Sequence, residues 1–203
     1  MDAVTIVDYG MGNLASVKNM LRRVGVQANI TGDASEIDRA KKLLLPGVGS
    51  FDAAMQQIAK RGLREVLDRK ALHDRVPTLG ICLGMQLITR GSEEGVLPGL
   101  GWVDAAAYRF PRAGGLRVPH MGWNVVRPTR ESALTAGLPD ESRFYFVHSY
   151  YVKADRPADA ILTANHGVTF DAAVEAGNVL GAQFHPEKSH RFGMHLLANF
   201  ARI

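Results

Sequence analysis

The feature that most constrains the fold is a repeated unit in the first half of the chain. Each unit is an apolar run, a glycine-containing turn and then apolar residues at helical spacing. The runs are residues 3–7, 42–45 and 76–79, and the glycine pairs are 10/12, 47/49 and 80/84. Strands that alternate with helices in this way build βαβ units and a parallel sheet. Because ligands of such sheets bind beside the carboxyl ends of the strands, we expect the three glycine loops to meet at one functional edge.

The second half of the chain has a different pattern. Strand-like runs follow one another with no long helical stretch until residues 192–200, and they cover residues 101–105, 123–126, 143–147, 161–164 and 179–184. This arrangement is typical of antiparallel strands added to a parallel sheet. We therefore predict an α/β fold, with a mostly parallel sheet flanked by helices and antiparallel strand additions. With 203 residues, no long linker and no internal repeat of the amino-acid sequence itself, we expect one domain over residues 1–203.

Composition excludes several classes of protein. The net charge is +4, but the basic residues are dispersed and do not alternate with aromatic residues, so we expect no nucleic-acid binding. No apolar run approaches the roughly 18 residues that span a bilayer, and Met1–Val4 does not resemble the start of a signal peptide, so we expect no membrane association. A single cysteine rules out an internal disulfide and is consistent with the reducing cytoplasm.

That cysteine, Cys82, lies in the third glycine turn. The sequence Gly-Ile-Cys-Leu-Gly-Met-Gln (residues 80–86) joins a predicted strand to a predicted helix, and its glycines permit the close backbone approach of a sharp elbow. An elbow would hold the thiol at a strand end and a helix start, where the thiolate form is favoured. The alternative is a small buried hydrophobic residue. The flanking glycines favour a nucleophile.

A cysteine nucleophile needs a base, and the base needs a group that orients it. Of seven histidines, His185 directly follows a predicted strand in the sequence His-Pro-Glu. Pro186 biases His185 towards extended backbone, so the side chains of His185 and Glu187 are expected on one face. Alternatively, Glu187 only provides a favourable charge at the start of the last helix. Beside a cysteine elbow, the catalytic interpretation is preferred.

A tetrahedral intermediate also requires hydrogen-bond donors for its oxyanion. In an elbow, the N–H group of the residue after the nucleophile, here Leu83, is the expected first donor. The second is expected from the glycine loop of residues 46–49, at Val48 or Gly49, although this loop could equally be an ordinary turn before a helix.

Together these motifs resemble the triad, or class-I, glutamine amidotransferases. Four further motifs resemble one branch of that family, the glutaminase subunits of imidazole glycerol phosphate synthase. They are residues 8–14 (Asp-Tyr-Gly-Met-Gly-Asn-Leu), 45–51 (Leu-Pro-Gly-Val-Gly-Ser-Phe), 119–124 (Pro-His-Met-Gly-Trp-Asn) and 145–150 (Tyr-Phe-Val-His-Ser-Tyr). The resemblance extends over nearly the whole chain, in order and without a large insertion.

The resemblance implies a glutaminase of the histidine biosynthesis pathway. Cys82 would attack the side-chain amide of glutamine, a γ-glutamyl thioester would form, and ammonia would leave. His185 would transfer the protons, Glu187 would orient it, and water would release glutamate. It further implies that the glutamine is bound by a set of pocket residues, namely Gln86, Gly49, Ser149 and Tyr150. Gln86 could otherwise be a helix-surface residue.

The resemblance also implies a partner. Ammonia would pass to a cyclase subunit, a (β/α)8 barrel on a separate chain, in a heterodimer. The residues that resemble the family's docking surface for this cyclase are Asn13, His120, Trp123, Tyr145 and Lys188. Trp123 could equally be a core residue and Lys188 a solvated charge. No cofactor and no metal ion are implied.

Two alternative functions are compatible with parts of this sequence. The chain could serve another triad amidotransferase, such as the enzyme of anthranilate, guanylate or pyridoxal-phosphate synthesis, although residues 119–124 and 145–150 argue against this. It could also be a non-catalytic binding module, against which the intact set of Cys82, His185 and Glu187 argues.

Overall fold

The computed structural model describes residues 3–111 and 115–203, so Met1 and Asp2, which entered the signal-peptide prediction, lie outside it. Its main feature is an eight-stranded sheet in the order β2-β1-β3-β4-β12-β11-β10-β7. The strands of its parallel half are β2 (Ala28–Thr31), β1 (Val4–Val7), β3 (Leu43–Gly47), β4 (Thr78–Cys82) and β12 (Val179–Ala182). The antiparallel extension consists of β11 (Val168–Ala176), β10 (Ala160–His166) and β7 (Arg127–Pro128).

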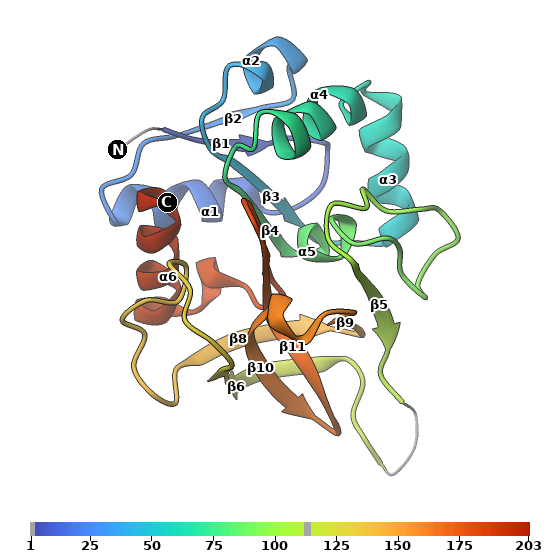
Figure 1. The fold of residues 1–203 in the computed structure, drawn as a ribbon, viewed down its shortest axis with the longest axis vertical. Coiled ribbons are helices and arrows are strands. Elements are labelled where there is room, and N and C mark those ends of the chain that lie inside the picture. The colour runs from blue at the N-terminus through green and yellow to red at the C-terminus, as the bar shows by residue number, and fades with distance from the viewer. Residues whose placement is uncertain (1–2, 112–114) are drawn as a thin grey trace.

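Two strand pairs lie beside this sheet. β5 (Ala105–Arg109) pairs with β9 (Tyr150–Ala154), and β6 (His120–Val125) pairs with β8 (Arg143–His148), both antiparallel. Figure 1 shows these strands below the parallel half of the sheet, in the lower part of the molecule. The predicted mostly parallel sheet with antiparallel additions is therefore confirmed.

Helices cover both faces of the parallel half. In Figure 1, α1 (Leu14–Arg23) and α6 (His190–Arg202) lie on one side, with α3 (Phe51–Lys60), α4 (Arg64–Asp68) and α5 (Leu83–Leu87) on the other. The remaining helical segments are short: α2 (Ala34–Asp38), η1 (Arg69–His73), η2 (Pro157–Asp159) and η3 (Pro186–Lys188). None of the helices in the described part of the chain has the length and hydropathy to cross a membrane.

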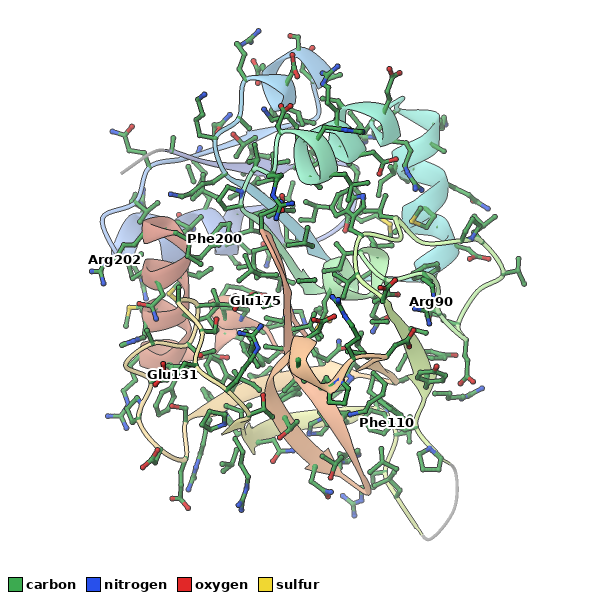
Figure 2. All side chains as sticks on the ribbon, viewed as in Figure 1. Arg90, Phe110, Glu131, Glu175, Phe200 and Arg202 are labelled. Atoms are coloured by element: carbon green, nitrogen blue, oxygen red, sulfur yellow. The ribbon has the colours of Figure 1, made fainter. Side chains whose placement is uncertain are left out.

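Successive residues of the central strands supply two separate cores. Leu44 of β3 packs in the core that includes α1 and α6, whereas Leu43 and Leu45 pack in the core that includes α3 and α4. This follows from the alternation of side chains along a strand, and a strand buried on both faces must be apolar throughout. On α6, Phe200 is buried in the first core while Arg202 extends outward (Figure 2).

One predicted strand is wrong in its position. Residues 101–104 form no strand, and β5 begins only at Ala105. Gly101 has a φ of +72°, and the Trp102 backbone N–H donates to the Ile88 carbonyl at 2.9 Å. The segment is therefore held as a loop against the end of α5, because its backbone donors bind that helix and not a neighbouring strand.

Candidate active site

The glycine elbow places Cys82 in an unusual backbone conformation. Cys82 has φ +54° and ψ −108° at the junction of β4 and α5, a region that residues other than glycine rarely occupy. The turn is tight, because a Cβ atom at Gly84 would overlap the Leu45 carbonyl and one at Gly80 would overlap the Gly84 carbonyl. The thiol is held at the carboxyl end of β4 with only 7% of the residue exposed.

Parallel pairing brings the second glycine loop to the same edge. Gly47, the last residue of β3, is the register partner of Cys82, and Val48 and Gly49 follow it directly. The buried Tyr9 hydroxyl donates to the Pro46 carbonyl at 2.7 Å, which fixes the base of the loop. The loops therefore converge as the sheet topology predicts, and they bring Val48 and Gly49 beside the nucleophile.

His185 and Glu187 form a buried pair. His185 Nδ1 lies 2.8 Å from Glu187 Oε1, and the two side chains are 2% and 5% exposed. His185 itself is extended, with φ −103° and ψ 96°, but η3 begins at Pro186, so the two residues meet across a turn and not along an extended strand. His185 is further held by its backbone, whose N–H donates to the Tyr145 carbonyl at 2.9 Å.

The other nitrogen of this histidine is available for chemistry. His185 Nε2 is buried and has no hydrogen-bond partner among the described residues. Burial lowers the pKa of His185, but the contacts with the Cys82 sulfur and the Glu187 carboxylate outweigh burial and raise the pKa to about 10. The imidazole is therefore protonated beside the sulfur. Its Nε2 carries a proton and, among the described residues, has no acceptor other than the Cys82 sulfur.

A cavity of about 430 Å³ opens at Cys82. Of the described residues, its lining includes every predicted oxyanion and pocket residue, namely Val48, Gly49, Leu83, Gln86, Ser149 and Tyr150. The volume and the mixture of apolar walls with a few polar groups are typical of a small-molecule site. A larger cavity of about 900 Å³, lined by residues between 128 and 137 and by Glu175, contains none of the predicted site residues.

The site also contains residues that were not predicted, among them Glu94 and Gln183. Glu94 lines the cavity, and its Oε2 accepts the Phe51 backbone N–H at 3.0 Å; burial raises the pKa of this carboxyl. Gln183 is fully buried, with Nε2 4.0 Å from Cys82 Sγ and Oε1 3.5 Å from Gln86 Nε2. Glu94 lies in a loop without periodicity, and Gln183 precedes the predicted His185 within a strand-like run. Neither position carries a local signal.

The predicted docking residues separate into an exposed group and a buried one. Trp123 is 47% exposed and packs edge-on against Tyr145, while the Lys188 ammonium lies 5.8 Å from the centre of the Tyr145 ring. Asn13 is exposed and caps α1, whose helix packs against η3. His120 is only 5% exposed and belongs to the interior.

Comparisons with known proteins show which family the chain belongs to. The model of the glutamine amidotransferase class-I family matches residues 5–203. The imidazole glycerol phosphate synthase subunit HisH 2 of Pseudomonas aeruginosa is 50% identical over 200 residues, which cover 98% of this chain and 99% of the relative. The protein of the same name from Methanococcus maripaludis is 47% identical over 199 residues, covering 98% of each chain. A solved structure of a glutamine amidotransferase has a TM-score of 0.75 at 18% identity, covering 99% of this chain and 100% of that one, which shows a shared fold.

The fold, the elbow and the family match together define the class: the chain belongs to the class-I glutamine amidotransferases, and it is an enzyme of that type. Within the class, the full-length relatives place it among the HisH glutaminase subunits of imidazole glycerol phosphate synthase. The family and the activity predicted from the motifs are confirmed.

Proposed function

We propose that Cys82, His185 and Glu187 are the catalytic triad of this glutaminase, which we take to be one domain over residues 1–203. The observation that carries the proposal is the buried 2.8 Å contact between His185 Nδ1 and Glu187 Oε1, with the ring beside the Cys82 sulfur and Nε2 without a hydrogen-bond partner in the described part of the chain. Glu187 fixes the proton on Nδ1 and so directs Nε2 to the sulfur and the substrate.

The chemistry follows from this arrangement. The Cys82 thiolate attacks the side-chain amide carbon of glutamine, and the negative charge moves to the amide oxygen. Backbone N–H groups of Leu83 and of the Val48–Gly49 loop stabilise that oxyanion. His185 Nε2 then gives its proton to the departing nitrogen, so ammonia leaves and a γ-glutamyl thioester remains. Water, deprotonated by His185, attacks the thioester and restores the Cys82 thiolate with release of glutamate.

The cavity supports glutamine as the substrate. Glu94 is the one charged residue among the described lining residues, and its carboxylate is matched to the α-ammonium group of an amino acid. Gln86 and the backbone of Gly49, Ser149 and Tyr150 form the rest of the polar wall. We assign these residues to glutamine binding.

The product ammonia requires an acceptor. Because the relatives are named as subunits of a synthase, a partner subunit belongs to the assembly. We propose that this partner is a separate cyclase chain with a (β/α)8 barrel, bound as a heterodimer at the surface around Trp123, Tyr145 and Lys188. We also propose a cytoplasmic location, where a reducing environment keeps Cys82 from being oxidised.

The test is labelling and turnover of matched variants. Wild-type chain with its partner is expected to release glutamate and to be modified at Cys82 by a glutamine-analogue electrophile. Cys82→Ala and His185→Ala should each lose at least about 10³ of the turnover while still binding the partner. Retained turnover in either variant would defeat the triad assignment, and absence of labelling in the complex would favour a non-catalytic module.

A further inference from the structure

A chain of hydrogen bonds runs through the interior behind the glutamine pocket. The Asn124 side-chain amide lies 3.1 Å from His120 Nε2, His120 Nδ1 lies 2.9 Å from His148 Nε2, and His148 Nδ1 lies 2.8 Å from the Tyr150 carbonyl. The two histidines are register partners across β6 and β8. We name these groups the histidine relay. None of its side chains is used in the mechanism above.

The two ends of the relay fix the position of every proton in it. A carbonyl only accepts, so His148 Nδ1 must carry a proton for Tyr150. At the other end, Asn124 Oδ1 accepts the Val125 N–H at 2.8 Å and Nδ2 donates to the Asn165 carbonyl at 2.9 Å, which sets the amide orientation and leaves an N–H for His120 Nε2. In two neutral rings His120 Nδ1 is then the donor and His148 Nε2 the acceptor. The Tyr150 carbonyl and the Asn124 amide therefore require the same tautomer of each ring, with the proton on Nδ1 of both His120 and His148.

Packing keeps both rings in place and neutral. His120 and His148 are 5% and 6% exposed, and His120 is stacked between Phe146 at 4.7 Å and His166 at 4.2 Å. Burial, reinforced by neighbouring histidines, lowers the pKa of His120 to about 4 and that of His148 to about 3. The relay is therefore a rigid, directional structure at neutral pH.

The relay ends on a wall of the pocket. The Tyr150 carbonyl accepts both the His148 ring N–H and, at 3.1 Å, the side-chain amide of Gln86. Gln86, His148, Ser149 and Tyr150 all line the cavity that opens at Cys82. Two donors on one carbonyl fix the peptide at the β8–β9 junction and, through Gln86, the first helical turn after the nucleophile.

We propose that His148 is a positioning residue for substrate binding: held in one tautomer by Asn124 and His120, it fixes the Tyr150 carbonyl and thereby the shape of the glutamine pocket. This inference rests on the proposed function of that pocket. The relay begins on β6, one residue from the exposed Trp123, so the strand that carries the proposed docking surface also supports the pocket wall.

The test compares two replacements of His148 in the chain with its partner subunit. His148→Phe keeps a ring but removes both polar atoms, whereas His148→Asn places an amide N–H close to the former Nδ1. We expect His148→Phe to raise the KM for glutamine about tenfold or more with a smaller change in kcat, since a buried carbonyl loses a donor and ground-state binding is lost. His148→Asn should stay within about threefold of the wild-type KM.

His166→Phe is the matched control, because His166 stacks on the relay but its Nε2 contacts the Arg117 carbonyl and not a relay atom. It should leave KM unchanged. Equal KM increases in His148→Phe and His148→Asn, or no increase in His148→Phe, would overturn the relay proposal. Because the wild-type complex would still turn over glutamine, the proposed function would not be affected. A wild-type complex that neither turns over glutamine nor is labelled at Cys82 would instead overturn the proposed function, and the relay proposal with it.

Discussion

At the residue scale, His120 and His148 make the free energy of unfolding depend on pH. Both pKa values are lowered in the folded chain, to about 4 and about 3, from an ordinary value of 6.5. Between pH 6.5 and 4 the unfolded chain therefore binds protons that the folded chain does not, so the free energy of unfolding falls as pH falls. Each ring contributes a slope of up to about 1.4 kcal/mol per pH unit. Urea denaturation between pH 7 and 4.5 should show that the free energy of unfolding falls less per pH unit in His148→Asn than in wild type. Equal slopes in the two proteins would contradict the lowered pKa of His148.

Single residues differ in how far the sequence reveals them. The elbow at Cys82 and the contact between His185 and Glu187 could be predicted from local signals, the glycine spacing and the His-Pro-Glu order, although the two side chains meet across a turn and not along an extended strand. Glu94 and Gln183 could not, because their positions beside the pocket and the thiol come from packing between segments distant in sequence. The burial of His120 was likewise invisible, since its partner His148 is 28 residues away.

At the element scale, the close packing of α5 against β3 depends on Gly84. A Cβ atom there would overlap the Leu45 carbonyl, and neither backbone can yield without moving the nucleophile. Gly84→Ala is expected to cost about 3 kcal/mol or more in the free energy of unfolding and to abolish glutamate release. Gly91→Ala is the control: the nearest atom to its added methyl would be the Leu97 carbonyl oxygen at 3.9 Å, so stability should stay within about 0.5 kcal/mol. Equal stability of the two variants in urea would refute this account of the elbow.

Whole elements show the same division between local and distant causes. The parallel strands were predictable because burial on both faces requires continuous apolar runs. β11 was missed because its interior contains Asp171, a charge that strand patterns exclude. The fold makes that charge acceptable, since Asp171 binds Lys153 Nζ at 2.9 Å and the Ala154 N–H at 2.8 Å, both from β9. This pairing of a buried carboxylate with a half-exposed ammonium group forms only once β9 and β11 meet.

At the scale of the whole molecule, topology explains why the site lies where it does. Parallel pairing of β3, β4 and β12 brings the Val48–Gly49 loop, Cys82 and His185 to one edge, as the order of strands and glycine turns predicted. The same edge borders β6 and β8, whose outer face exposes Met121 and Trp123 at 62% and 47%. Exposed apolar groups of this size next to an active site are typical of an interface with a partner.

That arrangement predicts that the partner controls the reaction. Glutamate release by the chain alone should be slow and should rise about 5- to 150-fold when the proposed cyclase chain and its substrate are added, a coupling of ordinary size between two sites. Trp123→Ala should raise the partner concentration needed for half-maximal activation about tenfold or more, because it removes an exposed aromatic side chain from the proposed docking surface. Cys82→Ala is the control for docking and should bind the partner as wild type does. Equal turnover with and without the partner would show that the pocket is complete in the free chain, and normal activation of Trp123→Ala would place the interface on another face of the molecule.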